Sequence, residues 1–452
     1  MNAPQARGLP PGRLVVPALA GIVGAVGACV WLGLGLLSLP GLGLLAGVAV
    51  VGTVGALWWA PAVPALLIPA ILPLPQVRVF FPFELLLGAF AGLVLVHGLR
   101  RGTTWAWRLR GVEVANASLI LWALFSGFWC WDGLSFFLGA RRMVVGWAAL
   151  WTASRLPRVA RREWFDTGLV ACALSLSLSA LGHRIASGLS TQAAIVERAS
   201  ATDLGWGTAN YIASLLLILA PPVFVIAQRH RHAALRFPAW LALLAIAALQ
   251  TLVASRAATV LFFAGIGAMV LFSLRRGRLA GMLLLLLAMT VAILTPYGQA
   301  LLLRFSNARD LGSMVLRIWY FREAWHRTVD FFPWGMGLNQ GLVYPDHLAG
   351  TDTHNYWLSL SSELGVPGVV LWTAVLALLY RQILRLQRMP GRRADGLALA
   401  VAFWLAQLHT LVEPTFQGVQ YQFLFFWVLG AILAYGAARA DGEPFARSIS
   451  VR

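Results

Sequence analysis

Long apolar stretches recur along the chain and constrain its fold more than any other feature of the sequence. A helix of about 20 apolar residues can cross a lipid bilayer, because it satisfies its own backbone hydrogen bonds inside the hydrocarbon. The 452 residues are 59% hydrophobic and only 12% charged, and their mean hydropathy is +0.75. A water-soluble fold cannot bury so much apolar surface, so the sequence predicts an all-α polytopic membrane protein.

The apolar stretches predict about 12 to 14 transmembrane helices. The range allows for the stretch 63–74, which is short and rich in proline. We predict no separate soluble domain, so that residues 1–452 form a single integral membrane domain. The candidate stretches are 14–36, 41–59, 63–74, 83–98, 115–131, 134–153, 164–181, 211–227, 240–253, 257–274, 279–294, 366–380, 397–411 and 423–437.

The basic residues, all of them arginine, predict the orientation of these helices. A formal net charge of +18 would suggest nucleic acid in a soluble protein, but here the arginines cluster in short loops between apolar stretches. Cytoplasmic loops are enriched in arginine, and placing both termini in the cytoplasm puts roughly two thirds of the arginines there. We therefore expect cytoplasmic termini, contact with membrane lipids and no nucleic-acid partner.

One predicted outer loop, residues 296–364, is roughly 70 residues long, whereas ordinary connections have about 4–6. Loops of this length are usually functional, so we expect the function of the chain to lie there. Within the loop, residues 313–329 have the pattern of a helix that Pro333 and the glycines at 335, 337 and 341 would end. Apolar and cationic groups on adjacent faces would allow this helix to lie along the membrane surface.

Arginines in and near this loop are candidates for binding an anionic substrate. Arg317, Arg322 and Arg327 lie on the predicted loop helix, where they can also contact lipid head groups or pair with Glu323. Arg256 lies between two apolar stretches, which indicates a buried anion, a water-filled cavity or a side chain that reaches the interface. Two converging guanidinium groups would suit a diphosphate, because each binds phosphate oxygens bidentately.

His354 is the candidate for proton transfer beside such an anion site. A neutral imidazole can accept a proton from an attacking hydroxyl, and His409 is a weaker candidate for the same role. The alternative is that His354 is a structural residue at the start of a helix. The predicted helix covers 357–363, with Thr353 or Asp352 as its cap and Gly365 and Pro367 at its end.

Motifs for metals and nucleotide cofactors are missing from the sequence. There is no HExxH motif, no pair of histidine ligands and no cysteine cluster near His354, so no metal centre is predicted. There is also no Walker-type loop and no dinucleotide fingerprint. We therefore expect no cofactor, and the energy for a reaction must come from the substrate itself.

Several motifs, taken with their order and hydrophobic spacing, resemble a known family. The motifs are GTANYIASLLL at 207–217, SRAAT at 255–259, LRIWYFREAW with PWGMGLNQ in the long loop, THNYWLSLSSELGVPG at 353–368, and the weaker LHTLVEPTF at 408–416. In these segments the chain is similar to the O-antigen ligase and O-antigen polymerase superfamily of bacterial envelope glycosyltransferases. The N-terminal segments match that family in hydropathy only.

The resemblance implies an inverting, metal-independent transfer of O-antigen glycan from undecaprenyl diphosphate to lipid A-core oligosaccharide. The reaction would take place at the periplasmic face of the bacterial inner membrane, with 296–364 as the periplasmic catalytic loop. His354 would be the general base that activates the acceptor hydroxyl. Arg317 and Arg256 would hold the diphosphate and stabilise the leaving group, with Arg322 as a further candidate for binding it.

The resemblance also suggests roles for three other residues. Glu413 falls where some ligases have an acidic residue, and would orient a cation or the histidine. Asn355 and Asn210 match motif positions, and we expect them to support the site as amide hydrogen-bonding groups. The expected oligomeric state is a monomer.

Other functions remain open at this point. Within the family, the chain could be an O-antigen polymerase or a protein O-oligosaccharyltransferase. Polymerases tend to carry two large outer loops and this chain has one, which favours the ligase. From a different class, a transporter of a lipid-linked anionic substrate would line its path with the same arginines, but matching Gly- or Pro-broken segments in two halves are not seen.

Overall fold

The computed structural model describes residues 63–74, 81–100, 110–186, 209–253, 255–272, 283, 290, 309–344 and 353–440. These residues are mostly helical and contain no strand, which confirms the predicted all-α class. The stretches 14–36 and 41–59, and all but two residues of 279–294, lie outside the described residues. The helices are α3 (Val63–Ala70), α4 (Pro82–Arg100), α5 (Gly111–Phe125), η2 (Ser126–Trp129), α6 (Gly133–Ala153), α7 (Leu156–Val159), α8 (Arg162–Ala186), α11 (Ala209–Arg229), α12 (Ala233–Val253), α13 (Arg256–Phe272), α16 (Arg309–Asp330), α17 (Tyr356–Arg388), α18 (Arg393–Thr410), η3 (Thr415–Gln417) and α19 (Val419–Ala440).

Six helices in the described part of the chain are long and apolar enough to cross a membrane. The protein is therefore a helical bundle suited to a membrane, as its apolar stretches predict, and the total of 12 to 14 spans stays a prediction. Every predicted stretch within the described residues coincides with a helix. The six spans are Gly111–Trp129, Arg162–Gly182, Asn210–Arg229, Ala233–Gln250, Tyr356–Arg388 and Val419–Ala438.

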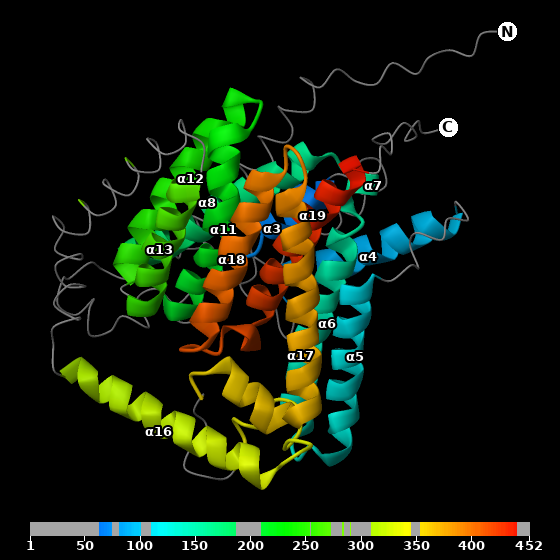
Figure 1. Ribbon diagram of the computed structural model, residues 1–452, viewed down its shortest axis with the longest axis vertical. Helices are drawn as coiled ribbons and strands as arrows, with labels where there is room; N and C mark the ends of the chain where they lie inside the picture. Colours follow the sequence, from blue (N-terminus) through cyan, green and yellow to red (C-terminus); the bar gives the residue numbers. More distant parts are fainter. Residues whose placement is uncertain are drawn as a thin grey trace.

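Helices α11 and α19 form the interior of the bundle (Figure 1). In each of them 89% of the apolar window is buried, so their side chains contact protein on nearly every side. Helix α19 packs along α6, and α11 packs against α12 and α18. Gly430 of α19 faces Leu150 and Ala153 of α6, where an added Cβ would lie 3.1 Å from the Cβ of Ala153. Small residues at this contact let the two helices approach closely.

Helix α16 lies across one end of the bundle (Figure 1). It confirms the helix predicted for 313–329 and extends it at both ends. One stripe of the helix is buried, with Ala324 at 0% and Arg327 at 2% exposure, whereas Val315 and Ile318 on another face are 66% and 65% exposed. Its amphipathic pattern therefore has a protein-facing stripe and a broad outer face that keeps apolar groups exposed.

The segment after α16 folds back onto α17 at a kink. Gly365 has φ 62° and ψ −162°, a backbone conformation that is essentially restricted to glycine. The kink leaves backbone groups without helical partners, and the returning segment bonds to them. The N–H of Val366 donates to the carbonyl of Pro333, and the N–H of Gly337 donates to the carbonyl of Glu363, both at 2.9 Å.

The predicted cap of this helix is wrong. Asn355 is the N-cap of α17, and its side chain accepts a hydrogen bond from the N–H of Leu358 at 3.1 Å. Thr353 lies two residues too early to do so, and its hydroxyl donates to the carbonyl of Asn355 at 3.0 Å instead. Asp352 lies outside the described residues.

The predicted end of the helix at Gly365 and Pro367 is confirmed, because α17 consists of two helical segments that meet at a kink at Gly365. The chain leaves helical geometry at Gly365 and then resumes, so that α17 continues to Arg388. Pro367 falls in the first turn of the resumed segment, where its fixed φ suits a helix and its missing N–H has no partner to lose. Gly365 therefore ends the first helical segment, and the second segment follows directly after the kink.

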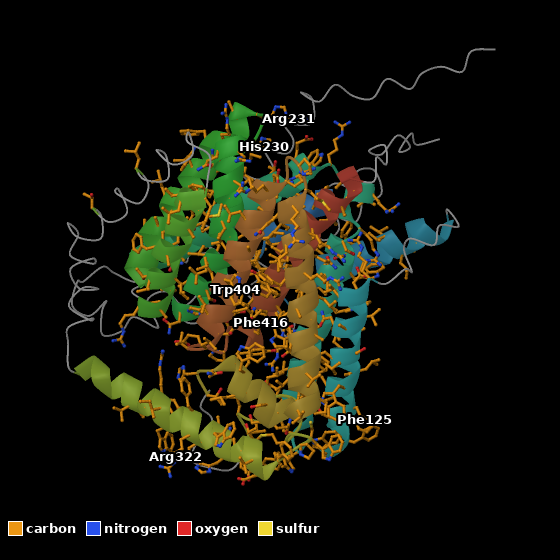
Figure 2. The ribbon with its side chains drawn as sticks, viewed as in Figure 1. Phe125, His230, Arg231, Arg322, Trp404 and Phe416 are labelled. Atoms are coloured by element: carbon orange, nitrogen blue, oxygen red, sulfur yellow. The ribbon has the colours of Figure 1, made fainter. Side chains whose placement is uncertain are left out.

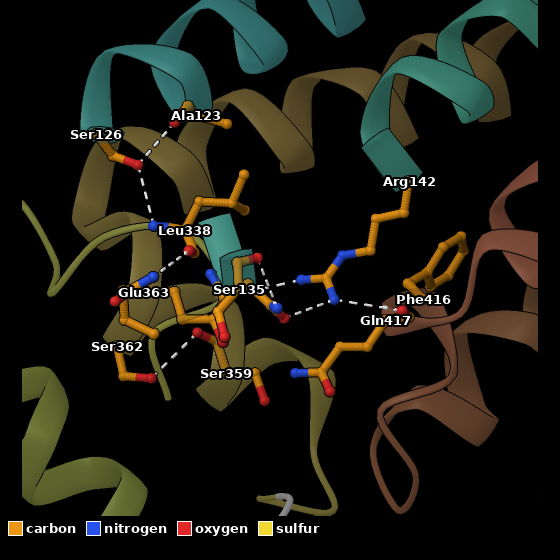
Figure 3. A network of polar contacts seen from close by, with 12 residues as sticks. Ala123, Ser126, Ser135, Arg142, Leu338, Ser359, Ser362, Glu363, Phe416 and Gln417 are labelled. Carbon is orange, nitrogen blue, oxygen red and sulfur yellow. Dashed lines mark hydrogen bonds and ion pairs between the residues drawn. The ribbon is translucent and has the colours of Figure 1, made fainter. Parts of the chain in front are cut away.

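A buried polar network ties the returning segment to α6 and to the loop before α19 (Figure 3). Arg142 of α6 donates to Oδ1 of Asn339 at 2.8 Å and to the carbonyl of Gln417 at 3.3 Å. Glu363 of α17 accepts from the N–H of Asn339 at 2.8 Å, and its carboxylate lies 3.7 Å from Arg142. Since buried charges are tolerated only when they are paired, this network holds the three segments in one arrangement.

Candidate functional site

Glu413 is the centre of a polar cluster at the end of the bundle that α16 crosses. Its Oε1 accepts hydrogen bonds from Nη2 of Arg317 and from Nδ2 of Asn210, both at 2.7 Å. Its Oε2 lies 3.5 Å from Nδ1 of His354. One carboxylate thus joins side chains from α11, from α16 and from the residues just before α17.

The loop after α18 holds Glu413 in this position. The N–H of Glu413 donates to the carbonyl of His409 at 3.0 Å, which folds the loop back on the helix end. Further along, Phe416 is fully buried (Figure 2). It packs against Trp372 of α17 and Phe425 of α19, with ring centroids 4.9 Å apart in both pairs. Phe416 therefore anchors the loop in the bundle and keeps the carboxylate at the bundle end.

The carboxyl group of Glu413 has a pKa below its ordinary value. Burial of the side chain raises this pKa, but the contact with His354 and the positive charge of Arg317 lower it by more. Glu413 is therefore ionised at neutral pH. Its negative charge pairs with the guanidinium group of Arg317.

His354 has an unusual backbone and a defined ring position. Its φ of 52° lies in the left-handed region that few residues other than glycine adopt. Such a conformation costs about 1–3 kcal/mol and is concentrated at functional sites. The imidazole stacks on the ring of Tyr320, with centroids 5.4 Å apart and planes at 29°. Its side chain is 33% exposed, so part of the ring is open to molecules from outside.

Helix α16 presents only some of its candidate residues to the cluster. Arg317 and Tyr320 are three residues apart and so share one face of the helix. Arg322 is exposed and lies on the side of α16 turned away from the bundle (Figure 2). Its Nε lies 3.5 Å from Nε2 of His326. Five positions separate Arg322 from Arg317, which is about 140° around a helix. The structure therefore does not bring Arg322 to Glu413.

Arg256 is the first residue of α13 and lies at the same end of the bundle as the cluster. Two hydrogen bonds show how far along the bundle axis α13 begins. Oγ1 of Thr259 donates to the carbonyl of Gln250 at 3.1 Å, and Nε2 of Gln250 donates to the carbonyl of Ala213 at 2.9 Å. Ala213 is about one turn beyond Asn210 on α11, so α13 begins close to the level of the Glu413 cluster.

The two candidate asparagines connect the elements of the site. Asn355 caps α17 with its Oδ1, and its Nδ2 donates to the carbonyl of Leu411 at 3.2 Å. Asn210 lies in the first turn of α11 and donates to Glu413. Each asparagine therefore joins one helix end to the loop that carries the carboxylate.

Tyr320 belongs to the site although sequence reasoning missed it. Its position three residues after Arg317 is the signal that could have identified it, since both side chains must then share a helix face. His409, the weaker histidine candidate, is fully buried, and neither of its ring nitrogens has a hydrogen-bond partner among the described residues. His409 is therefore closed to a substrate in this arrangement.

The described residues contain no group of three or more His, Cys, Asp or Glu side chains arranged to bind a metal ion. No protein-family model matches the chain, and no curated protein matches it significantly.

Proposed function

We propose that the chain is an inverting glycosyltransferase of the O-antigen ligase type. It would move O-antigen glycan from undecaprenyl diphosphate to lipid A-core oligosaccharide at the periplasmic face of the bacterial inner membrane. The observation that carries the proposal is the cluster of His354, Glu413 and Arg317, where a proton acceptor lies beside a cation at the end of the helix bundle. The resemblance of its motifs to the O-antigen ligase superfamily supports the same reaction.

His354 would act as the general base toward the acceptor hydroxyl. With Nδ1 lying 3.5 Å from Oε2 of Glu413, Nε2 is the ring nitrogen that would accept the hydroxyl proton. As the imidazole gains this proton, the negative charge of Glu413 stabilises the positive charge that forms. A positioned general base typically contributes roughly 10²–10⁴-fold to the rate.

In the transfer step, the acceptor oxygen would form a bond to the anomeric carbon while the bond from that carbon to the diphosphate oxygen breaks. The diphosphate leaves with the bonding electron pair, and attack from the opposite side inverts the anomeric configuration. Arg317 uses one terminal nitrogen for Glu413, which leaves further N–H donors for phosphate oxygens. Arg317 and Arg256 would bind the charge of the leaving diphosphate.

The proposal includes a topology. The membrane domain would have 12 to 14 helices, with both termini in the cytoplasm and the loop 296–364 in the periplasm, as the distribution of arginines favours. The scheme uses no metal or cofactor, because a lipid diphosphate is already an activated donor and the arginines can accept its charge.

The substitution His354→Ala tests the proposal. Purified protein with this change is expected to remain folded and to lose at least about 100-fold in the transfer of glycan from undecaprenyl diphosphate to lipid A-core. His326→Ala is the matched control, since it removes an exposed imidazole of α16 outside the cluster. Transfer at a near-normal rate by His354→Ala would contradict the proposal.

The lipopolysaccharide of a deletion strain separates the ligase from the alternatives. A strain without the ligase is expected to accumulate polymerised carrier-linked glycan and to leave all of its lipid A-core uncapped. Loss of a polymerase would instead leave single glycan units attached to the core. If the chain were a transporter, purified protein in detergent would show no transfer at all.

A further inference from the structure

A cavity of about 660 Å³ opens at the opposite end of the bundle from the Glu413 cluster. Helix α11 connects the two sites, with Asn210 in the cluster and Arg229 at the cavity. Nineteen positions of helix span about 29 Å, which is close to the thickness of a bilayer hydrocarbon core. Figure 2 labels His230 and Arg231 at the cavity end of the bundle, far from Phe416 beside the cluster.

The cavity is lined mainly by charged side chains and carries more positive than negative charge. Five arginines and three carboxylates face it, together with the half-buried His230. Val225, Ile226 and Tyr435 supply an apolar wall. The arginines are Arg161, Arg162, Arg229, Arg231 and Arg392, and the carboxylates are Glu163, Asp166 and Asp395.

The buried carboxylates of the cavity are already paired within the protein. Arg162 donates from Nη1 and Nη2 to the two oxygens of Asp395 at 2.6 and 2.7 Å, and its Nε lies 3.4 Å from Asp166. Asp395 also accepts from Arg392 at 3.2 Å. Because Arg162 and Arg392 match the negative charges of Asp166 and Asp395, these carboxylates do not repel an anion that enters the cavity.

The surplus positive charge lies at the rim. Arg231 is paired with Glu163 at 2.6 Å. Arg161 and Arg229 are exposed, and neither forms an ion pair with a described residue. Among the described residues, no hydrogen bond or ion pair occupies their guanidinium groups, and they lie on adjacent helix ends, at the start of α8 and the end of α11.

We infer that this cavity binds a phosphate group, which the head group of an anionic lipid supplies from the leaflet at that face. Guanidinium groups bind phosphate oxygens bidentately. The two positive charges of Arg161 and Arg229 match the two negative charges of a phosphate monoester and exceed the single negative charge of a phosphodiester. The volume falls within the range of about 300–1,000 Å³ typical of ligand sites.

The position of the cavity identifies lipid as the source of the phosphate. It lies where membrane-crossing helices reach the surface, and its wall of Val225 and Ile226 can contact the apolar part of a lipid while the arginines hold its head group. Anionic lipids attract basic residues at the cytoplasmic surface of membranes. The inference does not depend on the proposed glycosyl transfer, which concerns the other end of the bundle.

Lipid binding to purified protein tests the inference. The chain is purified in a neutral detergent, titrated with phosphatidylglycerol or phosphatidylcholine, and analysed by native mass spectrometry. The double variant Arg161→Gln/Arg229→Gln is expected to bind phosphatidylglycerol about tenfold more weakly or worse, with its binding of phosphatidylcholine unchanged. The control Arg236→Gln/Arg385→Gln removes two exposed arginines near the same end that do not line the cavity, and should bind as wild type does.

Soluble anions distinguish the two sources of phosphate. Inorganic phosphate and pyrophosphate are added at constant ionic strength while the thermal unfolding midpoint is followed. One possible result is that these anions stabilise wild type but not Arg161→Gln/Arg229→Gln, while wild type binds phosphatidylglycerol no better than phosphatidylcholine. This result would support the phosphate site and overturn lipid as the source of the phosphate. If both double variants lost the same affinity for phosphatidylglycerol, or if neither lost any, the proposed phosphate site would be overturned.

Discussion

His354 keeps its strained backbone because the residues on either side of it are fixed. Asn355 caps α17, and the hydroxyl of Thr353 contacts the hydroxyl of Ser359 one turn into that helix. The ring of His354 is held between Tyr320 on one side and the carboxylate of Glu413 on the other. The position of the imidazole therefore depends on α16, α17 and the loop after α18 together.

The pairing of Glu413 with Arg317 and His354 predicts an acid-sensitive contribution to stability. Folding lowers the pKa of Glu413, so its contribution is complete above about pH 4.5, its ordinary pKa, and is lost as the pH falls through the lowered value. At neutral pH, Glu413→Gln should therefore lower the free energy of unfolding by about 1–2 kcal/mol, because Arg317 loses its charged partner. The thermal unfolding midpoint should fall accordingly.

The difference between Glu413→Gln and wild type should shrink as the pH falls below the ordinary pKa, and unfolding scans in detergent from pH 7 to pH 3 measure it. Glu323→Gln, a carboxylate of α16 outside the cluster, is the control and should show no such convergence. A constant difference between Glu413→Gln and wild type across this range would refute the assigned charge state of Glu413.

Most residues of the cluster could be named from the sequence because each lies in a motif or at an unusual position. His354, Glu413, Arg317 and Asn210 were candidates, and the fold brings all four together. The separation of Arg322 from this group could not be foreseen, since the pattern of α16 allows more than one of its faces to meet the bundle.

At the scale of secondary structure elements, the kink in α17 holds the segment that follows α16. A Cβ at Gly365 would collide with backbone atoms of Pro333 and Trp334, and its backbone conformation is closed to other residues. Gly365→Ala is expected to destabilise the protein by about 2 kcal/mol or more, since the colliding atoms are backbone and cannot move aside easily.

Gly267→Ala is the matched control for this prediction, because no atom lies within 4 Å of a Cβ added there. It should be neutral or slightly stabilising, as alanine favours a helix over glycine. Thermal unfolding of both variants in the same detergent measures the difference. Equal midpoints for the two variants would show that the docking of the 333–337 segment does not depend on the kink.

The elements themselves follow closely from local sequence, whereas the start of α17 does not, since Asn355 and not Thr353 is its cap. The apolar stretches predict nearly every described helix, because burial in lipid or protein requires the same apolar residues. The break at Gly365 was predicted as the end of a helix, since glycine followed by proline normally stops one, and the structure has a break there. The structure adds that the segment after α16 bonds to backbone groups at this break.

For the whole molecule, the proposed topology predicts that α16 and the far end of α11 lie on opposite sides of the membrane. In a chain whose three cysteines are replaced by serine, Arg322→Cys should react with an impermeant maleimide added outside intact inner-membrane spheroplasts. His232→Cys, exposed just beyond α11, should react only after the membrane is permeabilised. Both positions reacting from the same side would reject the orientation.

The sequence by itself determined that the chain is helical, that it is suited to a membrane, and which polar residues are candidates for chemistry. These conclusions need only local composition and spacing, because apolar length and helical periodicity are properties of short segments. The tertiary structure decided that Glu413 joins Arg317, Asn210 and His354, and that the cavity at the other end of α11 is lined by arginines from three helix ends. Both arrangements depend on how α8, α11, α16 and α18 pack, and packing between distant segments is not encoded in any one of them.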